Sequence, residues 1–560
     1  MNKYRNRTLL TTFAVVVISV FTTAYIFRNE SKDFKLQKNL DIFYSLVREL
    51  NAFYVDELKP DKLFEAGIDE MLNELDPYTT YYPESERDDF AFMTTGKYGG
   101  IGSRIRKSGD YTVLTQIYEG FPADKAGLKA GDILKKINGE SLKGLDAEGV
   151  SEKLKGEPNT EMTLLIERQG EELEKTLTRK RVTIPPVPYY GMLDKETAYI
   201  KFTNFTQDCS ADVRNALQTL LEEEGAKKII LDVRSNPGGL LKEAVDIVNL
   251  FVGPGHEVVS TKGRVERFDN TYETTRQPVN EEIPLVIMIN RATASAAEIL
   301  AGAVQDLDRG VIVGQRSYGK GLVQISRPLS YNATLKVTTA KYYIPSGRCI
   351  QAIDFSNRNE DGSVGYIPDS LTTAFETLHG RTVRDGGGIA PDYKVDPQQL
   401  SQLSTRLYVQ SLIFDFATEF YWENPEIEKP GSFEIGDETY QELENFLKER
   451  TFSYESATQN ALERLDTVAK REKYYESNKE LFEKLKKRLD HNLHNDLKTF
   501  RDEITRLLED EIIGRYYYEE GVIKHSLDLD KQIKKALEVI NDESLYVSTL
   551  KGTSGMLSRK

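Results

Sequence analysis

The sequence contains few of the residues that build metal centres and disulfide frameworks. Its 560 residues include only two cysteines, Cys209 and Cys349, and five histidines, which are scattered along the chain. Two cysteines exclude a disulfide scaffold and a cysteine-rich zinc module, and scattered histidines argue against a multi-histidine metal site. We therefore expect neither a metal site nor a cofactor.

Basic side chains are outnumbered by acidic ones. There are 74 Lys and Arg side chains against 89 Asp and Glu, which gives a formal net charge of −15. Nucleic-acid binding depends on clustered cations that contact phosphates, so this balance argues against a nucleic-acid partner. With 39% hydrophobic and 29% charged residues, the chain has a globular composition, and its length predicts three or four domains.

Long apolar runs are absent except for residues 9–27, LLTTFAVVVISVFTTAYIF. A run of about 19 residues without a charge can span the hydrocarbon layer as a helix. Lys3, Arg5 and Arg7 precede it, which predicts that the N-terminus stays in the cytoplasm. The sequence therefore predicts a single-pass signal anchor in a bacterial inner membrane, with the bulk of the chain in the periplasm. A cleaved signal peptide is the alternative, although Thr23-Ala24-Tyr25 is a poor cleavage site.

Changes in residue pattern divide the chain into five segments. Residues 1–32 are the basic stub and anchor, and residues 33–90 carry apolar side chains at helical spacing. Residues 91–182 contain short β-like runs with turn signals, and residues 183–397 alternate strand and helix patterns. Residues 398–560 are mostly helical and charged. We predict an α/β core with an inserted β-rich domain, an N-terminal helical segment and an α-helical C-terminal extension.

The strand and helix patterns can be placed along the sequence. The expected strands cover residues 111–117, 133–137, 162–168, 198–202, 228–233, 285–290 and 310–314. The expected helices cover residues 147–154, 239–250, 295–307, 440–450 and 476–508. The C-terminal helices carry no metal, phosphate or nucleotide motif, and a dimerisation arm, an adaptor-docking surface and a lid are open alternatives for them.

Three groups of motifs follow one another in the middle of the chain. The first is GGIG at residues 99–102 with FPADKAGLKAGDIL at residues 121–134, and it resembles a PDZ domain. The second is LDVRSNPGG at residues 231–239. The third is NRATASAAEI at residues 290–299 with GQRSYGKGLVQ at residues 314–324. Together, over residues 33–397, they resemble the carboxyl-terminal processing peptidases, also called tail-specific proteases, which implies an α/β serine protease core with an inserted PDZ domain.

The resemblance assigns catalytic roles to three side chains. Ser295 matches the nucleophile, Lys320, 25 residues later, the general base, and Gln324 the group that positions the lysine amine. The residues also favour this chemistry by themselves, because a helix N-terminus stabilises developing negative charge and burial shifts lysine toward the neutral form that a base needs. Histidine is the usual base, but the α/β core contains only two histidines, His256 and His379, and neither lies in a family motif.

Taken singly, two of these residues have ordinary structural interpretations. Ser295 could be a helix N-cap, and Lys320 could be a solvated cation of a loop. Strand alternation predicts that Lys320, Leu322 and Gln324 share one face, so that the Gln324 amide can orient the amine.

The resemblance also implies an oxyanion hole. The N–H of Ala296 and one N–H of Gly238 or Gly239 would form it, and the sequence does not choose between the two glycines. The alternative is an ordinary strand-to-helix turn at Asn236-Pro237-Gly238-Gly239.

In the PDZ-like segment, Gly100, Ile101 and Gly102 match the loop whose N–H groups bind a free C-terminal carboxylate, with Ile101 in the apolar pocket. Arg168 matches a recurrent basic position, and we hypothesise that it couples the PDZ domain to the active site. The alternative is an exposed arginine at a strand end.

The sequence therefore predicts a membrane-anchored serine endopeptidase that recognises substrate C-termini and cleaves by a Ser-Lys mechanism through an acyl-enzyme. Its partners would be proteins or peptides with free, apolar C-termini, the membrane through residues 9–27, and a second copy or an adaptor through the helical regions. The alternatives are a catalytically inactive PDZ adaptor and a crotonase-like acyl-CoA enzyme. The complete set of matched residues disfavours the adaptor, and the PDZ insertion and the Ser-Lys spacing disfavour the acyl-CoA enzyme.

Overall fold

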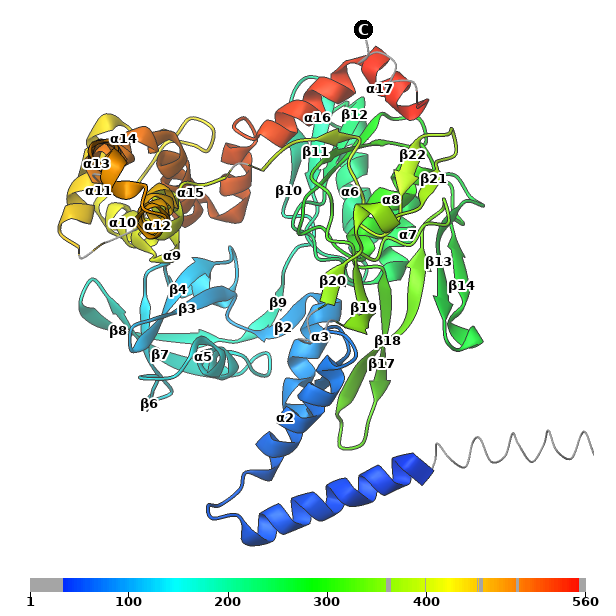
Figure 1. Cartoon of the computed structure of the whole chain (residues 1–560), viewed down its shortest axis with the longest axis horizontal. Coiled ribbons are helices and arrows are strands. Elements are labelled where there is room, and N and C mark those ends of the chain that lie inside the picture. The colour runs from blue at the N-terminus through cyan, green and yellow to red at the C-terminus, as the bar shows by residue number, and fades with distance from the viewer. Residues whose placement is uncertain are drawn as a thin grey trace, which may run out of the picture. The chain divides into compact units, whose positions relative to one another are not determined.

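The computed structural model describes residues 34–358, 364–397, 399–450, 452, 457–489 and 493–552. The described residues form two units, one up to Tyr81 and one from Tyr82 onward. β1 (Thr80–Tyr82) lies at the boundary between them. The main body of the second unit contains the PDZ-like domain, the α/β core and the C-terminal helices (Figure 1).

The first unit is helical where it is described. Residues 34–53 and α2 (Pro60–Asn73) are helices, and they contact each other through Phe43 and Phe64, whose ring centroids are 6.0 Å apart. The predicted anchor, residues 9–27, lies outside the described residues. Within the part that the structure describes, every helix is too short or too polar to cross a bilayer.

The PDZ-like domain is inserted through a pair of strands. β2 (Lys97–Gly100), where the chain enters, pairs antiparallel with β9 (Lys180–Thr183), where it leaves. Between them lies an antiparallel sheet in the order β3-β4-β5-β7-β8, with β6 paired to β5. Its elements are β3 (Ser103–Ser108), β4 (Tyr111–Ile117), α4 (Pro122–Lys125), β5 (Ile133–Ile137), β6 (Glu140–Ser141), α5 (Ala147–Leu154), β7 (Glu161–Arg168) and β8 (Glu171–Thr178). Because the two ends of the domain are adjacent, it fits into the larger chain without separating the flanking segments.

The α/β core is built on a six-stranded sheet in the order β10-β11-β12-β15-β16-β23. All neighbours from β11 to β23 are parallel, and only β10 is antiparallel. The strands are β10 (Tyr189–Met192), β11 (Thr197–Lys201), β12 (Lys228–Asp232), β15 (Leu285–Ile289), β16 (Val311–Gly314) and β23 (Tyr393–Lys394).

Helices bury both faces of this sheet. On one face, α6 (Cys209–Glu222), α7 (Leu241–Val248) and α8 (Ala296–Asp306) pack against side chains such as Leu231 and Ile287. On the other, the C-terminal helices α16 (Lys531–Asn541) and α17 (Glu543–Leu550) pack against Ile230 and Met288. Alternate residues of one strand thus enter different cores, which explains why the strands read as continuous apolar runs.

A second, antiparallel sheet lies beside the first. Its strands β17, β18, β13 and β14 are neighbours in that order. Their bounds are β13 (Glu257–Gly263), β14 (Asn270–Glu273), β17 (Leu322–Pro328) and β18 (Thr334–Tyr343). The remaining elements of this part of the chain are η1 (Glu84–Glu86), α3 (Arg87–Thr95), η2 (Glu266–Phe268), β19 (Ile353–Arg358), β20 (Val364–Tyr366), η3 (Asp369–Leu371), β21 (Ala374–Glu376) and β22 (Thr382–Arg384).

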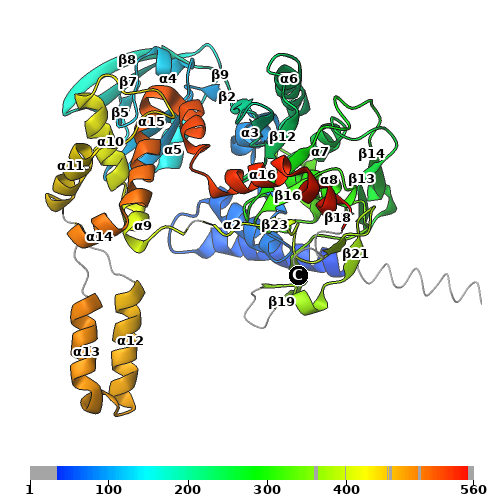
Figure 2. The ribbon, with the colours of Figure 1, turned by 90° about the horizontal axis from the view of Figure 1, so that it is seen from above.

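The C-terminal extension has its own core before it returns to the sheet. Its helices are α9 (Gln402–Val409), α10 (Leu412–Glu423), α11 (Asp437–Lys448), α12 (Ala457–Arg471), α13 (Tyr475–Leu489), α14 (Leu493–Thr499) and α15 (Arg501–Ser526). Side chains of α9, α10, α11, α14 and α15 share this core, whereas α12 and α13 form a hairpin that extends away from it (Figure 2).

The predicted fold class is confirmed. The expected strands and shorter helices are present within three residues of their predicted bounds. The expected helix over residues 476–508 is wrong, because this stretch contains α13, α14 and the start of α15.

Candidate active site

Ser295 lies at a sharp turn between β15 and α8. Its φ of 56° and ψ of −118° are rare for a residue other than glycine, so the surrounding contacts must hold it there. The next residue, Ala296, begins α8. Its N–H is therefore one of the N-terminal donors that have no partner within the helix, where the helix dipole favours negative charge.

The loop after β12 carries the two glycines expected at the oxyanion hole. Asn236 ties this loop down, because its Nδ2 donates to the carbonyl of Phe202 at 3.1 Å and its Oδ1 accepts from the N–H of Gly238 at 2.9 Å. Gly238 has a φ of 94°, and a Cβ there would lie 2.7 Å from the carbonyl oxygen of Ala294. Only glycine allows this loop to approach the Ser295 turn so closely. Among the described residues, no acceptor takes the N–H of Gly239.

Two buried side chains attach the loop of Lys320 to the Ser295 turn. Oε2 of Glu298 accepts from the N–H groups of Ser295, at 2.8 Å, and of Lys320, at 2.9 Å. The hydroxyl of Tyr342 faces the carbonyl oxygens of the same two residues, at 3.2 Å for Ser295 and 2.5 Å for Lys320. Since Glu298 and Tyr342 are buried, they hold the two backbone segments in one arrangement.

Glu298 has further donors around it. Its Oε1 accepts from the N–H of Gly319 at 2.7 Å and from the hydroxyl of Ser317 at 2.5 Å. Burial raises the pKa of Glu298 from 4.5 to about 7, against the hydrogen bonds, which lower it. None of the roles assigned from the sequence falls on Glu298. Its Ser-x-x-Glu spacing at a helix start is a signal for the contact with the Ser295 N–H, but no sequence signal indicates the contact with Lys320.

Gln324 lies on β17 beside a β-bulge. The register between β17 and β18 shifts between Val323 and Gln324, where Thr339 is an extra residue in β18. Lys320 precedes β17 and lines the site with Leu322, Val323 and Gln324, so a shared face of Lys320, Leu322 and Gln324 stays a prediction. Nε2 of Gln324 donates to Oγ1 of Thr338 at 3.1 Å, so the amide oxygen is the end that can accept a hydrogen bond from an amine.

All six residues assigned to catalysis line one pocket of about 560 Å³. They are Gly238, Gly239, Ser295, Ala296, Lys320 and Gln324. Apolar side chains, among them Phe92, Met93 and Ile299, contribute to the same lining. Of the described residues, those that line the pocket include neither His256 nor His379. The arrangement brings a hydroxyl, an amine and backbone N–H groups to one cavity, the set that acyl transfer requires.

A second cavity, of about 810 Å³, lies between the PDZ-like domain and the C-terminal helices. Gly100 and Ile101 line one side, together with residues of β3 and α5. Tyr408, Val409 and Phe414 line the other. Gly102 is not among the lining residues. Its φ is 77°, and a Cβ there would lie 2.4 Å from Cβ of Phe121. The C-terminal helices thus form a second wall of the expected peptide groove.

Arg168 lines neither cavity. Its guanidinium binds the buried Asp132 carboxylate through two contacts of 2.7 Å and donates to the carbonyl of Gly127 at 2.8 Å. The same group lies over the ring of Trp422 in α10, 5.1 Å from the centroid. With only 17% of its side chain exposed, Arg168 joins the PDZ-like domain to the C-terminal helices, and its coupling to catalysis stays a prediction.

Comparison with family models gives three matches along the chain. "Peptidase family S41" matches residues 196–357 and "PDZ domain" matches residues 113–168. "Probable PDZ-protease, C-terminal helical domain" matches residues 403–540, the extension in which the sequence motifs gave no resemblance.

Individual relatives agree with these matches. The chain is 32% identical over 346 residues to the Probable CtpA-like serine protease of Staphylococcus aureus (strain N315), which covers 61% of this chain and 68% of that protein. It is 33% identical over 321 residues to the Carboxy-terminal-processing protease of Bartonella bacilliformis, and this match covers 56% of this chain and 73% of that protein. Among solved structures, a photosystem II D1 C-terminal processing protease is 26% identical with a TM-score of 0.36, over 64% of this chain and 87% of that one.

Proposed function

Because the chain belongs to the carboxy-terminal-processing serine proteases of peptidase family S41, we propose that Ser295 is its nucleophile and Lys320 its general base. One observation carries the assignment: Glu298 and Tyr342 each contact the backbone of both residues, so nucleophile and base are held together. Gln324 orients the amine of Lys320 through its amide oxygen, because its Nε2 is engaged by Thr338.

The proposed reaction passes through an acyl-enzyme. Neutral Lys320 accepts the proton of the Ser295 hydroxyl while Oγ attacks the scissile carbonyl. The resulting ammonium returns the proton to the leaving amine as the C–N bond breaks. Lys320 then deprotonates a water molecule, which attacks the ester, and the proton passes back to Ser295 Oγ as the acid product leaves.

The oxyanion that forms in both steps is bound by backbone N–H groups of Ala296 and Gly239. Ala296 is favoured by its place at the N-terminus of α8. Gly239 is favoured over Gly238 because the Gly238 N–H already donates to Oδ1 of Asn236. Gly238 supports the hole differently, by letting the loop approach the nucleophile turn.

Substrate C-termini occupy the groove between the PDZ domain and the C-terminal helices. Ile101 and Phe414 line this cavity, which favours an apolar C-terminal side chain. In PDZ-type recognition, backbone N–H groups receive the free carboxylate and the peptide adds as a strand.

Amidation of a substrate's C-terminus is expected to raise KM about tenfold, because charge-assisted hydrogen bonds to the carboxylate are lost. The turnover number kcat should stay within about twofold, since the reacting bond lies in the other cavity. Steady-state cleavage of a peptide pair that differs only in this amide measures both constants. Equal KM values for acid and amide would disprove recognition of the free carboxylate.

Residues 9–27 act as a single-pass anchor in the inner membrane, with the protease in the periplasm. Their charge-free length and the preceding basic residues support this. We expect the full chain to remain in the membrane pellet after alkaline extraction, and a chain that starts at residue 33 to be released. An extracted protein whose mass lacks the first 25 or so residues would instead identify a cleaved signal peptide.

A further inference from the structure

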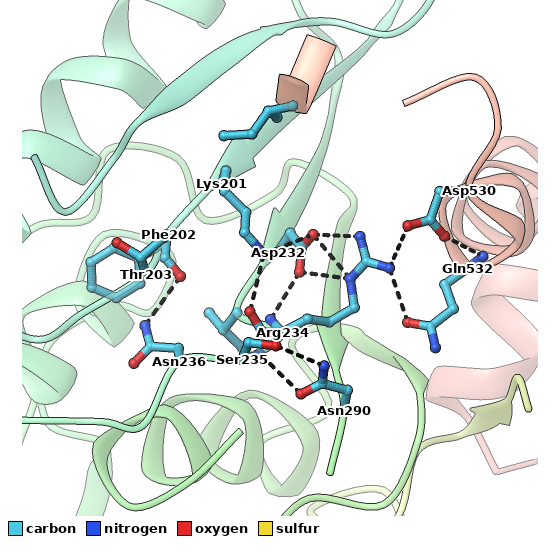
Figure 3. A network of polar contacts seen from close by, with 12 residues as sticks. Lys201, Phe202, Thr203, Asp232, Arg234, Ser235, Asn236, Asn290, Asp530 and Gln532 are labelled. Carbon is cyan, nitrogen blue, oxygen red and sulfur yellow. Dashed lines mark hydrogen bonds and ion pairs between the residues drawn. The ribbon is translucent and has the colours of Figure 1, made fainter. Parts of the chain in front are cut away.

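The C-terminal segment returns to the core at the loop that carries the oxyanion-hole glycines. α16 begins after Asp530, whose Oδ1 caps the helix. The same carboxylate faces Arg234, 296 positions earlier in the chain and just beyond β12. Figure 3 shows Arg234 between Asp232 on one side and Asp530 and Gln532 on the other.

The Arg234 guanidinium donates in both directions. Its Nε and Nη2 bind the Asp232 carboxylate, at 3.0 Å and 2.6 Å. Its Nη1 binds Oδ2 of Asp530 at 2.6 Å and Oε1 of Gln532 at 3.1 Å. Because the guanidinium is planar and its donors are fixed in direction, contacts on both sides determine its orientation.

Besides the apolar contacts of α16 with the sheet, the segment brings a negative charge, that of Asp530, to Arg234. Asp232 is fully buried and lies 3.3 Å from Nζ of Lys201. Although burial opposes it, the charges of Arg234 and Lys201 hold the pKa of Asp232 below its usual range. Two cations therefore face one buried carboxylate, and Asp530 supplies the second negative charge. A cation left unpaired in such a place is costly.

The contacts of Arg234 continue into the backbone of the loop. Its N–H donates to Oδ1 of Asp232 at 2.8 Å, and its carbonyl accepts from Nζ of Lys201 at 3.0 Å. The next residue, Ser235, has a φ of 61°. Ser235 exchanges two hydrogen bonds with Asn290, at 2.9 Å and 3.1 Å, where the nucleophile turn begins (Figure 3).

We propose that Arg234 is a positioning residue of the oxyanion hole and that Asp530 and Gln532 of the C-terminal segment hold it in place. The protease core is then catalytically complete only when α16 is docked. This inference rests on the proposed function, because it assumes that the loop after β12 donates an N–H to the oxyanion. Arg234 itself acts through the loop.

The test replaces Asp530 with residues that keep the helix cap. Ser and Asn both cap helices well, so Asp530→Ser and Asp530→Asn leave α16 capped while they remove the charge that faces Arg234. We expect kcat to fall about tenfold, which is less than the fall caused by removing a whole oxyanion-hole donor. KM should stay within about twofold of the wild-type value. The affinity for a peptide aldehyde, whose adduct places its oxygen in the hole, should fall by the same factor as kcat.

Asn541→Ala is the matched control. Asn541 ends α16 and accepts from Nζ of Lys228 at 2.7 Å, so it joins the same helix to the same sheet away from the loop. We expect Asn541→Ala to lower Tm as much as the Asp530 variants and to keep the wild-type kcat. Wild-type kcat and aldehyde affinity in both Asp530 variants would overturn the positioning role. Wild-type activity in Ser295→Ala would instead overturn the proposed function, and this inference with it.

Discussion

Lys320→Ala is expected to reduce kcat/KM for peptide cleavage by about 10³-fold, because the Ser295 hydroxyl loses the group that accepts its proton. Ser295→Ala should reduce it further, by at least about 10⁴-fold, since no acyl-enzyme can form. In Lys320→Ala the serine is still present. We therefore expect this variant to react slowly but measurably with a fluorophosphonate probe, and Ser295→Ala not to react. Single-turnover cleavage and probe labelling, followed by mass spectrometry, measure both effects.

Lys336→Ala is the control for this experiment. Lys336 lines the same pocket as Lys320 but lies on β18, so its replacement removes a nearby cation without changing the loop that Glu298 and Tyr342 hold. We expect Lys336→Ala to keep kcat within about threefold of the wild type, as for a change away from the reacting atoms. Full activity in Lys320→Ala together with a loss of activity in Lys336→Ala would assign the role of general base to Lys336.

The sequence could predict the members of the site because its motifs follow strands of one parallel sheet. β12, β15 and β16 are neighbours, and the glycine loop, the Ser295 turn and the loop of Lys320 each follow the carboxyl end of one of them. Carboxyl ends of adjacent parallel strands meet at one edge of the sheet. Residues that follow these strands therefore come together whatever their separation along the chain.

Contacts that depend on distant side chains could not be predicted in this way. The apolar run of β12 indicates that both faces of the strand are buried, but it does not say that α16 covers one of them. Tyr342 and Asp530 lie in an ordinary strand and at an ordinary helix cap, respectively. Their contacts with Lys320 and Arg234 depend on packing between segments that no local pattern connects.

Glu298→Gln is expected to lower kcat by about 10²-fold, the cost of displacing nucleophile and base by about 1 Å. All four partners of the carboxylate donate hydrogen bonds, and an amide would direct an NH₂ group at some of them. With a pKa of about 7 for Glu298, the ionised form that these donors need is reached as pH rises. The kcat of the wild type should therefore increase through pH 7, and Glu298→Gln should lack this limb.

The stability of the protein should change with pH in the opposite direction. Because the pKa of Glu298 is raised from 4.5 to about 7 on folding, the unfolded chain loses this proton first, and the stabilisation present below pH 4.5 is lost as pH rises through 7. The Tm of the wild type minus that of Glu298→Gln should thus be larger at pH 5 than at pH 8. Glu243→Gln is the control, since Glu243 is a buried acid that accepts from the N–H groups of Asp208 and Ser210. If the increase in kcat near pH 7 persists unchanged in Glu298→Gln, a group other than Glu298 causes it.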